Sequence, residues 1–227
     1  MKKAEVRERI EEIGIIPAVR AATDEDASFA AEAVASGGIP IVEITLTTPG
    51  AIDLITHLAK FHTNVLVGAG TILDLDTAKR CLDAGAQFLT DPCLDVELVE
   101  LAVKQDVVVL AGALTPTEVI TAWKAGSDFV KVFPCAQVGG EAYIRALKGP
   151  FPKIPLVAAG GVNQQTATNF ILAGASALGI GGELIPRTAI VKRQAEQVRE
   201  LSKRFIRLVR AARERLAASR EPVAISK

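Results

Sequence analysis

A lysine occupies the middle of an apolar segment, DFVKVF (128–133). If that segment is a β-strand, its side chains alternate between two faces, and Lys131 shares a face with Phe129 and Phe133. Lys131 then lies inside the protein or at the rim of its core, where burial of an ammonium favours the free amine. A free amine is what a nucleophile needs to form a Schiff base with a carbonyl.

A glutamate is placed in the same way in PIVEITL (40–46), where Ile41, Glu43 and Thr45 share one face. If the opposite, branched face packs on helices, Glu43 points to the interior and can face Lys131. A carboxylate there can transfer protons during carbinolamine formation and C–C cleavage. The alternative is a buried ion pair with no chemistry, because structural ion pairs also perturb charged groups. The occurrence of both residues at strand positions favours catalysis.

Two glycine pairs give a second signal: Gly160 and Gly161 in AAGGVN, and Gly181 and Gly182 in GIGGEL. Both follow expected strands, where glycine lets backbone N–H groups approach an anion. One such pair is more often only a tight turn. Two pairs after the last two strands favour a phosphate-binding site.

Other candidate binding residues also stand at expected strand ends. The Thr71 hydroxyl, at the end of GAGT, can bind a substrate carboxylate or cap the next helix. Arg20 is a candidate anion clamp, with an ordinary surface arginine as the alternative. Thr47, Pro92 and Phe133 complete the predicted substrate-binding set.

The sequence lacks the motifs that are typical of a metal site, a dinucleotide-binding site or a disulfide framework. His57 and His62 lie on or just after a helix and offer no metal site at the strand ends. No GxGxxG follows the first strand. Cys81, Cys93 and Cys135 lack framework spacing, which predicts reduced, buried thiols, with a place near the barrel mouth as the alternative for Cys93 and Cys135, which follow expected strands. We therefore expect no metal and no cofactor.

The elements that must position these residues alternate along the chain. Short apolar runs ending in Gly, Pro or Thr alternate with longer segments of helical period, the pattern of repeated βαβ units. Eight units in this length predict an α/β fold, a (β/α)8 TIM barrel, with an open doubly wound sheet as the runner-up. The expected strands are 15–19, 40–46, 65–70, 87–91, 107–112, 128–133, 155–160 and 177–182.

Helix starts and the C-terminal segment complete this organisation. Thr23, Thr115 and Asn163 are expected helix caps. From Thr188 onward the chain predicts one long charged helix whose apolar stripe covers the barrel. We expect one domain over 1–217, including this extended helix, and a flexible tail over 218–227.

Composition limits the classes of partner. The chain has 227 residues, 49% hydrophobic, enough for one sizeable core. Its 26 basic and 26 acidic residues cancel, so no overall charge favours nucleic acid or a membrane surface. No apolar run suits a signal peptide or a membrane span. These features predict a cytoplasmic protein with a small-molecule ligand.

The segments VEITLTTP, GAGT, GALTPTE, VKVFPC and AAGGV, in this order, resemble the 2-keto-3-deoxy-6-phosphogluconate (KDPG) and 4-hydroxy-2-oxoglutarate (KHG) aldolase family. The resemblance covers roughly residues 10 to 186. It implies a barrel-fold class I aldolase, typically a homotrimer, that acts on 2-keto acids in carbohydrate metabolism, including the Entner–Doudoroff route. It also implies that Lys131 is the Schiff-base lysine and Glu43 the general acid/base.

On this resemblance, Lys131 attacks the C2 carbonyl, the C3–C4 bond breaks, and pyruvate is released. The other product is glyceraldehyde 3-phosphate from KDPG or glyoxylate from hydroxyoxoglutarate.

The chain departs from the family pattern at three positions, with Thr47 in place of Arg, Ala159 in place of Thr and Gly182 in place of Ser, beside the anionic Glu183. Our hypothesis is that Arg20 takes over part of the anion binding.

Two other functions fit parts of the pattern. A phosphate-binding barrel isomerase or epimerase would share the glycine-rich loops and use Glu43 as its base, but it needs no Schiff-base lysine. A non-catalytic trimeric scaffold would tolerate Lys131→Met. The aldolase alone explains a lysine on the inward face of the sixth strand.

Overall fold

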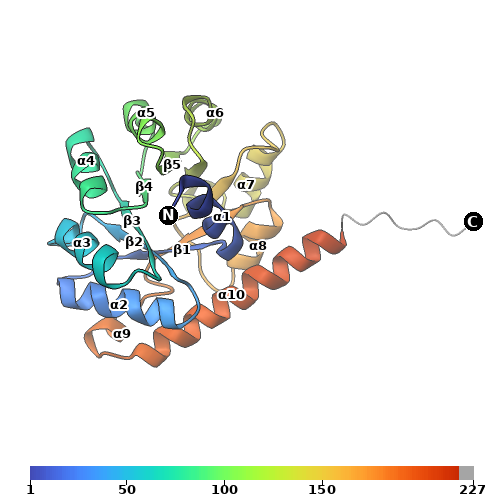
Figure 1. The fold of residues 1–227 in the computed structure, drawn as a ribbon. Coiled ribbons are helices and arrows are strands. Elements are labelled where there is room, and N and C mark those ends of the chain that lie inside the picture. Colours follow the sequence, from blue (N-terminus) through green and yellow to red (C-terminus); the bar gives the residue numbers. More distant parts are fainter. Residues whose placement is uncertain (220–227) are drawn as a thin grey trace, which may run out of the picture.

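A computed structural model describes residues 1–219, and in this part of the chain eight parallel strands close into a barrel (Figure 1). Strand β1 pairs with β2 on one side and with β8 on the other, where Ile15 lies opposite Leu178. This closure confirms the TIM barrel and excludes the open sheet. The strands are β1 (Ile15–Val19), β2 (Ile41–Thr45), β3 (Leu66–Gly70), β4 (Phe88–Thr90), β5 (Val108–Ala113), β6 (Phe129–Val132), β7 (Leu156–Ala159) and β8 (Ala177–Ile180).

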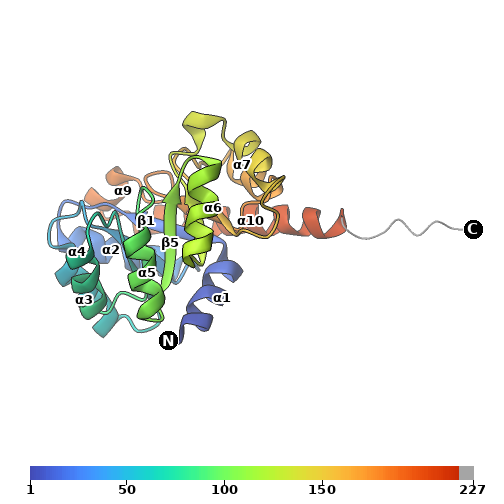
Figure 2. The same ribbon diagram turned by 90° about the horizontal axis from the view of Figure 1, so that it is seen from above.

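Helices follow the strands and surround the barrel (Figures 1 and 2). The first helix, α1, precedes the barrel, and its Lys3 Nζ lies 3.0 Å from Asp128 Oδ2, just before β6. The helices are α1 (Lys3–Ile13), α2 (Asp24–Ser36), α3 (Ala51–Phe61), α4 (Leu75–Asp83), α5 (Val96–Lys104), α6 (Pro116–Ala125), α7 (Glu141–Lys148), α8 (Ala167–Leu172), α9 (Arg187–Val191) and α10 (Ala195–Ala218), with a 3-10 turn at Ala136–Val138.

Two of the three predicted caps begin helices. The Thr23 hydroxyl accepts the N–H of Asp26 at α2, and Thr115 forms a reciprocal capping box with Glu118 at α6. Asn163 is different, because α8 begins only at Ala167. Its carboxamide oxygen accepts the N–H groups of the next turn and stabilises the loop before the helix.

The inward face of the barrel is filled unevenly, and this leaves room at one end. Phe88 packs against Gly68, where any Cβ would overlap its ring. Farther along the same two strands, Thr90 lies opposite Gly70. Large side chains therefore fill the deeper layer, while small residues near the carboxyl ends leave space for longer polar side chains.

The segment after Thr188 is not one helix. Helix α9 ends at Val191, and α10 begins at Ala195 after a turn in which Arg193 has a φ of 52°. This left-handed backbone is costly for arginine. The Arg193 guanidinium offsets the cost with an ion pair to Asp26, Nη1 to Oδ1 2.8 Å, and by stacking over Phe29. The contacts to α2 thus decide a break that helical periodicity conceals.

Helix α10 packs along α8 and α2, and its last turns extend beyond the barrel (Figures 1 and 2). Its buried stripe contains Val198, Phe205 and Val209. The helix ends at Ala218, one residue after the predicted domain boundary, and residues 220–227 of the predicted tail lie outside the described residues.

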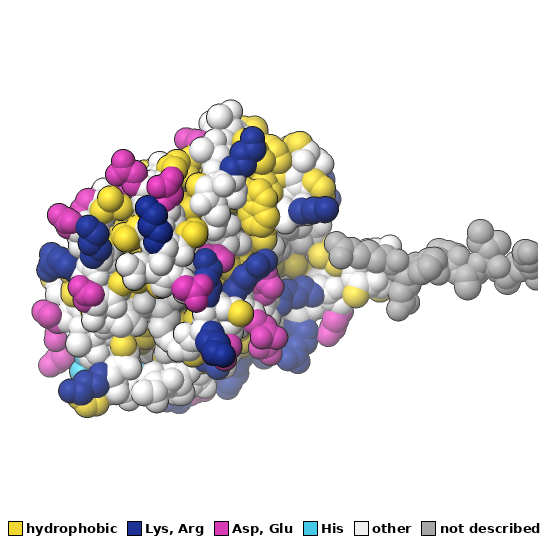
Figure 3. All heavy atoms as spheres, turned by 45° about the horizontal axis from the view of Figure 1, so that its top comes forward, with side chains coloured by type: hydrophobic (Ala, Val, Ile, Leu, Met, Phe, Trp, Pro, Cys, Tyr) yellow, Lys and Arg dark blue, Asp and Glu magenta, His cyan; other side chains and the backbone are white. Residues whose placement is uncertain are grey.

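Charged side chains of both signs are interspersed over the surface seen in Figure 3, in keeping with a net charge of zero. Within residues 1–219, no helix has the length and apolar character needed to cross a membrane.

Candidate active site

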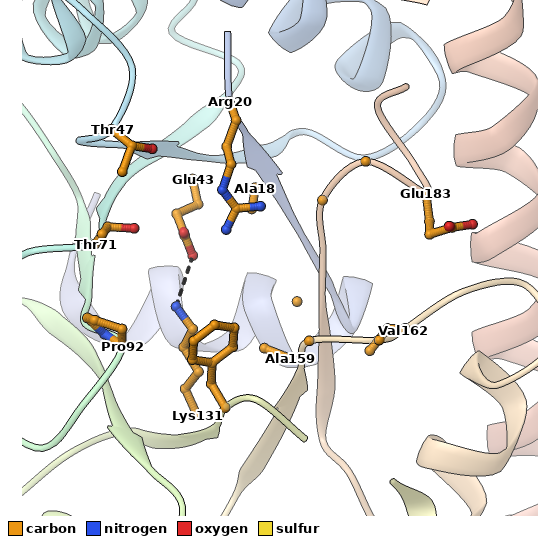
Figure 4. A pocket seen from close by; sticks show the side chains of 16 residues that line it. Ala18, Arg20, Glu43, Thr47, Thr71, Pro92, Lys131, Ala159, Val162 and Glu183 are labelled. Atoms are coloured by element: carbon orange, nitrogen blue, oxygen red, sulfur yellow. Dashed lines mark ion pairs between the residues drawn. The ribbon is translucent and has the colours of Figure 1, made fainter. Parts of the chain in front are cut away.

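The carboxyl ends of the strands surround a cavity of about 510 Å³ (Figure 4). The structure brings all the side chains and glycines predicted for the site into its lining. These are Arg20, Glu43, Thr47, Thr71, Pro92, Lys131, Phe133, Gly160, Gly161, Gly181 and Gly182, joined by Ala18, Ala159, Val162, Gly179 and Glu183.

Lys131 extends from β6 into this cavity. Its Nζ donates a hydrogen bond to Thr90 Oγ1 at 2.8 Å and lies 4.0 Å from Glu43 Oε2. The ring centroid of Phe133 is 5.7 Å from the same nitrogen. Only 12% of the lysine side chain and 7% of the glutamate side chain is exposed, so the pair is largely shielded from solvent. The amine is fixed in position and still borders open space, as attack on a carbonyl requires.

Glu43 reaches the cavity because β3 lacks side chains beside it. In the register of β2 and β3, Glu43 lies opposite Gly68, and a Cβ at Gly70 would overlap the Glu43 carboxylate. Gly70 therefore leaves the space that the carboxylate occupies. Figure 4 shows this carboxylate and the Lys131 ammonium pointing toward each other.

Arg20 follows β1, and its guanidinium turns toward the cavity (Figure 4). A Cβ at Gly181 would lie 2.8 Å from Arg20 Nη1, so this glycine leaves room for the guanidinium. Arg20 is exposed to solvent but also borders the cavity, which places a cation where an anionic substrate group can reach it.

Thr71 lies just beyond β3 with a φ of 63°, a rare conformation for a β-branched residue. It does not cap α4, because Asp74 does so by accepting the N–H of Thr77. This removes the capping alternative for Thr71. Thr47 is held by a 3.0 Å hydrogen bond between its hydroxyl and that of Thr45.

The glycines after β7 and β8 have structural requirements of their own. Gly160 and Gly161 have φ values of 85° and 82°, and a Cβ at Gly161 would overlap that of Ala136. By contrast, a Cβ at Gly182 would meet nothing within 4 Å. Glu183 beside it is exposed at the edge of the cavity, and its carboxylate points away from Lys131 in Figure 4.

Two polar residues of this site were not among the predicted site residues. Thr90 is the hydrogen-bond acceptor for Lys131, and Asp91 is fully buried beside it. Asp91 Oδ1 accepts a short hydrogen bond from the Gly112 N–H, whereas Oδ2 has no partner among the described residues. Burial raises the pKa of this carboxyl to about 7. The signal in the sequence was a polar pair, Thr90 and Asp91, at the end of the expected strand 87–91.

The histidines lie away from the cavity, with His62 Nε2 3.6 Å from Glu32 Oε1. Among residues 1–219, no three His, Cys, Asp or Glu side chains are grouped to hold a metal ion. Cys81 and Cys135 are buried, as expected, and burial raises both thiol pKa values to about 11. Cys93 is exposed, so the prediction of a buried thiol is wrong there, because the loop after β4 carries it to the surface.

Comparisons with known proteins agree with this geometry. The sequence model of a family described as "KDPG and KHG aldolase" matches residues 6–201. The 2-dehydro-3-deoxy-phosphogluconate aldolase of Pseudomonas aeruginosa is 31% identical over 203 residues, which cover 89% of this chain and 92% of that protein. The KHG/KDPG aldolase of Escherichia coli K12 is 30% identical over 193 residues, 85% of this chain and 90% of that one.

A solved structure is also similar. The KDPG aldolase of Legionella pneumophila, captured with pyruvate as a covalent carbinolamine intermediate, superimposes with a TM-score of 0.81 and 28% identity, over 87% of this chain and 96% of that one. Fold and sequence thus agree on one family.

Proposed function

Because this chain belongs to the KDPG and KHG aldolase family, whose members are lyases, we propose that it cleaves 2-keto-3-deoxy-6-phosphogluconate to pyruvate and glyceraldehyde 3-phosphate. Cleavage of 4-hydroxy-2-oxoglutarate to pyruvate and glyoxylate is the second proposed reaction. The observation that carries the proposal is the Lys131 amine, held by Thr90 and facing Glu43 inside the cavity.

In the first half of the proposed reaction, the free Lys131 amine attacks C2 of the keto acid and forms a carbinolamine. Glu43 transfers protons so that the C2 oxygen leaves as water and an iminium remains. The iminium withdraws electrons from the C3–C4 bond. Glu43 Oε2, 4.0 Å from Nζ, is close enough to serve a substrate bonded to that nitrogen.

In the second half, the Glu43 carboxylate accepts the proton of the C4 hydroxyl and the C3–C4 bond breaks. The aldehyde leaves, and the bonding electrons form an enamine at C3. Protonated Glu43 then returns a proton to C3, and water hydrolyses the resulting iminium to pyruvate and free Lys131. All steps use the enzyme's side chains and water alone.

The remaining lining residues fit the two ends of the substrate. Thr47, Thr71 and Arg20 line the cavity, and in this proposal the two hydroxyls bind the carboxylate beside C2 and Arg20 binds an anionic group. The glycines after β7 and β8 leave the backbone accessible to the phosphate. Pro92 and Phe133 supply apolar walls near Lys131.

Trapping with pyruvate and borohydride tests this function. We expect a reduced pyruvate adduct in the intact mass, mapped by peptide digestion to Lys131. Lys131→Met should lose both the adduct and the cleavage activity, while Lys124→Met, an exposed lysine on α6, should keep both. A folded protein without an adduct would exclude class I chemistry and favour the isomerase or the scaffold.

We also propose that the protein is a cytoplasmic homotrimer with a single barrel domain over 1–217. The family resemblance supports the trimer, and the absence of a membrane-crossing helix within residues 1–219 is compatible with this location. Sedimentation equilibrium should give three times the chain mass of 23.9 kDa. A monomer or dimer mass would contradict the trimer.

A further inference from the structure

Arg20 borders the cavity, but no polar contact fixes its side chain. In the described residues 1–219, its guanidinium has neither an ion-pair partner nor a hydrogen-bond partner. Its Nη1 lies beside Gly181, one of the glycines predicted to hold a phosphate, where a Cβ would be only 2.8 Å away. A long side chain without partners is directed mainly by the backbone from which it extends. The position of the Arg20 backbone therefore decides where the guanidinium meets an anion.

The backbone around Arg20 is held by two threonines of β2 and the turn after it. The register between β1 and β2 ends at Val19, so the sheet itself does not extend to Arg20. The Thr45 hydroxyl donates to the carbonyl oxygen of Val19 at 3.0 Å, and the Thr48 hydroxyl accepts the N–H of Ala21 at 3.3 Å. Thr45 is 0% exposed and Thr48 is 3% exposed. Arg20 thus lies between two residues that buried hydroxyls hold in place.

Thr48 makes a second hydrogen bond with a different consequence. Its backbone N–H donates to the carbonyl oxygen of Thr45 at 2.9 Å and closes the turn after β2. That turn contains Thr47, whose side chain lines the cavity. A substitution that removes only the Thr48 hydroxyl keeps this backbone bond. It therefore affects the backbone beside Arg20 and spares the turn that carries Thr47.

We propose that Thr48 is a positioning residue that acts through Arg20: its buried hydroxyl fixes the backbone after β1, so that the guanidinium meets the distal phosphate of the substrate beside Gly181. This inference rests on the proposed function, in which Arg20 binds an anionic group of the keto acid. It gives binding of the distal group to Arg20 and its support, and leaves the chemistry at Lys131 separate.

Thr48→Val tests this role, because valine has nearly the shape of threonine but no hydroxyl. The Ala21 N–H loses its acceptor, and the backbone beside Arg20 must shift to find another. The KM for 2-keto-3-deoxy-6-phosphogluconate should rise by roughly 3-fold to 10-fold, the effect of about one hydrogen bond. The kcat should stay close to the wild-type value, because the groups around Lys131 are untouched.

Two further variants show whether the hydroxyl is the cause. Thr48→Ser keeps the hydroxyl and should restore the wild-type KM. Thr56→Val removes an exposed hydroxyl that donates to the carbonyl oxygen of Ile52 within α3, and it should leave KM unchanged. A KM that Thr48→Ser raises as much as Thr48→Val does would overturn the inference, because the loss would then come from packing.

A double-mutant cycle with Arg20→Ala tests whether Thr48 acts through the arginine. Once Arg20 is absent, Thr48→Val should raise KM no further. A rise by the same factor in both backgrounds would overturn the inference and leave Thr48 as a general support of the loop. An unchanged KM in Thr48→Val alone would overturn it as well. Thr48→Ala, which also lacks the hydroxyl, serves in the same cycle if the valine variant does not fold.

Trapping with pyruvate and borohydride separates failure of this inference from failure of the proposed function. Pyruvate has no distal phosphate, so its half-saturation should be the same in Thr48→Val and in the wild type. An adduct on Lys131 together with independent effects of Thr48 and Arg20 refutes only the positioning role. The lack of an adduct in the wild type refutes the proposed function itself.

Discussion

The proposed chemistry of this protein depends on one nitrogen, Lys131 Nζ, and on three groups around it. Lys131 Nζ is fixed by a hydroxyl, faced by a carboxylate and bordered by an aromatic ring, all within 6 Å. Each neighbour does something different: Thr90 orients the amine, Glu43 can transfer protons, and Phe133 excludes water from one side. This division of roles allows each residue to be tested separately.

Glu43→Gln keeps the size of the side chain but cannot transfer protons. We expect kcat for cleavage to fall by about 10²- to 10⁴-fold, the usual range for loss of a general acid or base. The pyruvate adduct on Lys131 should still form, although more slowly. If cleavage is unchanged in Glu43→Gln, the carboxylate is only an ion-pair partner of the lysine.

Arg20→Ala removes the cation that borders the cavity beside Gly181. The KM for 2-keto-3-deoxy-6-phosphogluconate should rise by roughly 10-fold to 100-fold, the cost of losing a charged hydrogen bond. Half-saturation by pyruvate in borohydride trapping should not change if Arg20 binds the distal phosphate. Arg145→Ala on α7, an exposed arginine, is the matched control. An unchanged KM would end the hypothesis that Arg20 binds the substrate.

At the scale of elements, helix α10 is the feature that exceeds the needs of an eight-stranded barrel. It is 24 residues long and packs against α8 and α2. Arg213 near its end donates hydrogen bonds to the carbonyl oxygens of Glu12, 2.6 Å, and Ser176, 3.0 Å. These bonds join α10 to the chain just before β1 and β8. The helix therefore strengthens the place where the first and last strands close the barrel.

Phe205→Ala tests this stabilising role. Phe205 on α10 is 0% exposed, so its truncation should lower the free energy of unfolding by about 3–5 kcal/mol. Phe61→Ala, at 63% exposure on α3, should change it by less than about 0.5 kcal/mol. Chemical denaturation of both variants measures the difference. Equal effects would show that α10 adds length but little stability.

At the scale of the whole molecule, burial of Asp91 links stability to pH. The pKa of its carboxyl is raised from 3.8 to about 7 in the folded protein, because burial disfavours the charged form. A group with a raised folded pKa stabilises fully below its unfolded pKa, and this stabilisation is lost as pH rises through the folded value. The wild type should therefore lose stability between about pH 4 and pH 7 through this residue.

Asp91→Asn should remove this loss. The variant and the wild type should unfold with similar free energies near pH 4, and the variant should be more stable at pH 8 by up to about 4 kcal/mol, which is the shift of about 3 units converted to energy. Denaturant titrations at the two pH values measure the difference. A constant difference between the two proteins at both pH values would contradict a shifted carboxyl.

The sequence alone determined the fold and the identity of the central pair. Eight apolar runs that alternate with helical segments predicted the barrel. The alternation of side chains along a strand predicted that Lys131 and Glu43 point inward, because this alternation is local and does not depend on distant packing. The glycine pairs and Arg20 were predicted to border the cavity for a different reason, because the carboxyl ends of parallel strands meet at one end of a barrel.

Only the tertiary structure decided how distant segments meet. The break at Arg193 depends on Asp26 and Phe29 of α2, far away in the chain. The hydrogen bonds of Thr90 with Lys131 and of Asp91 with Gly112 depend on how β6 and β5 are placed relative to β4. Contacts of this kind are invisible to local patterns, because their partners are fixed only when the barrel closes.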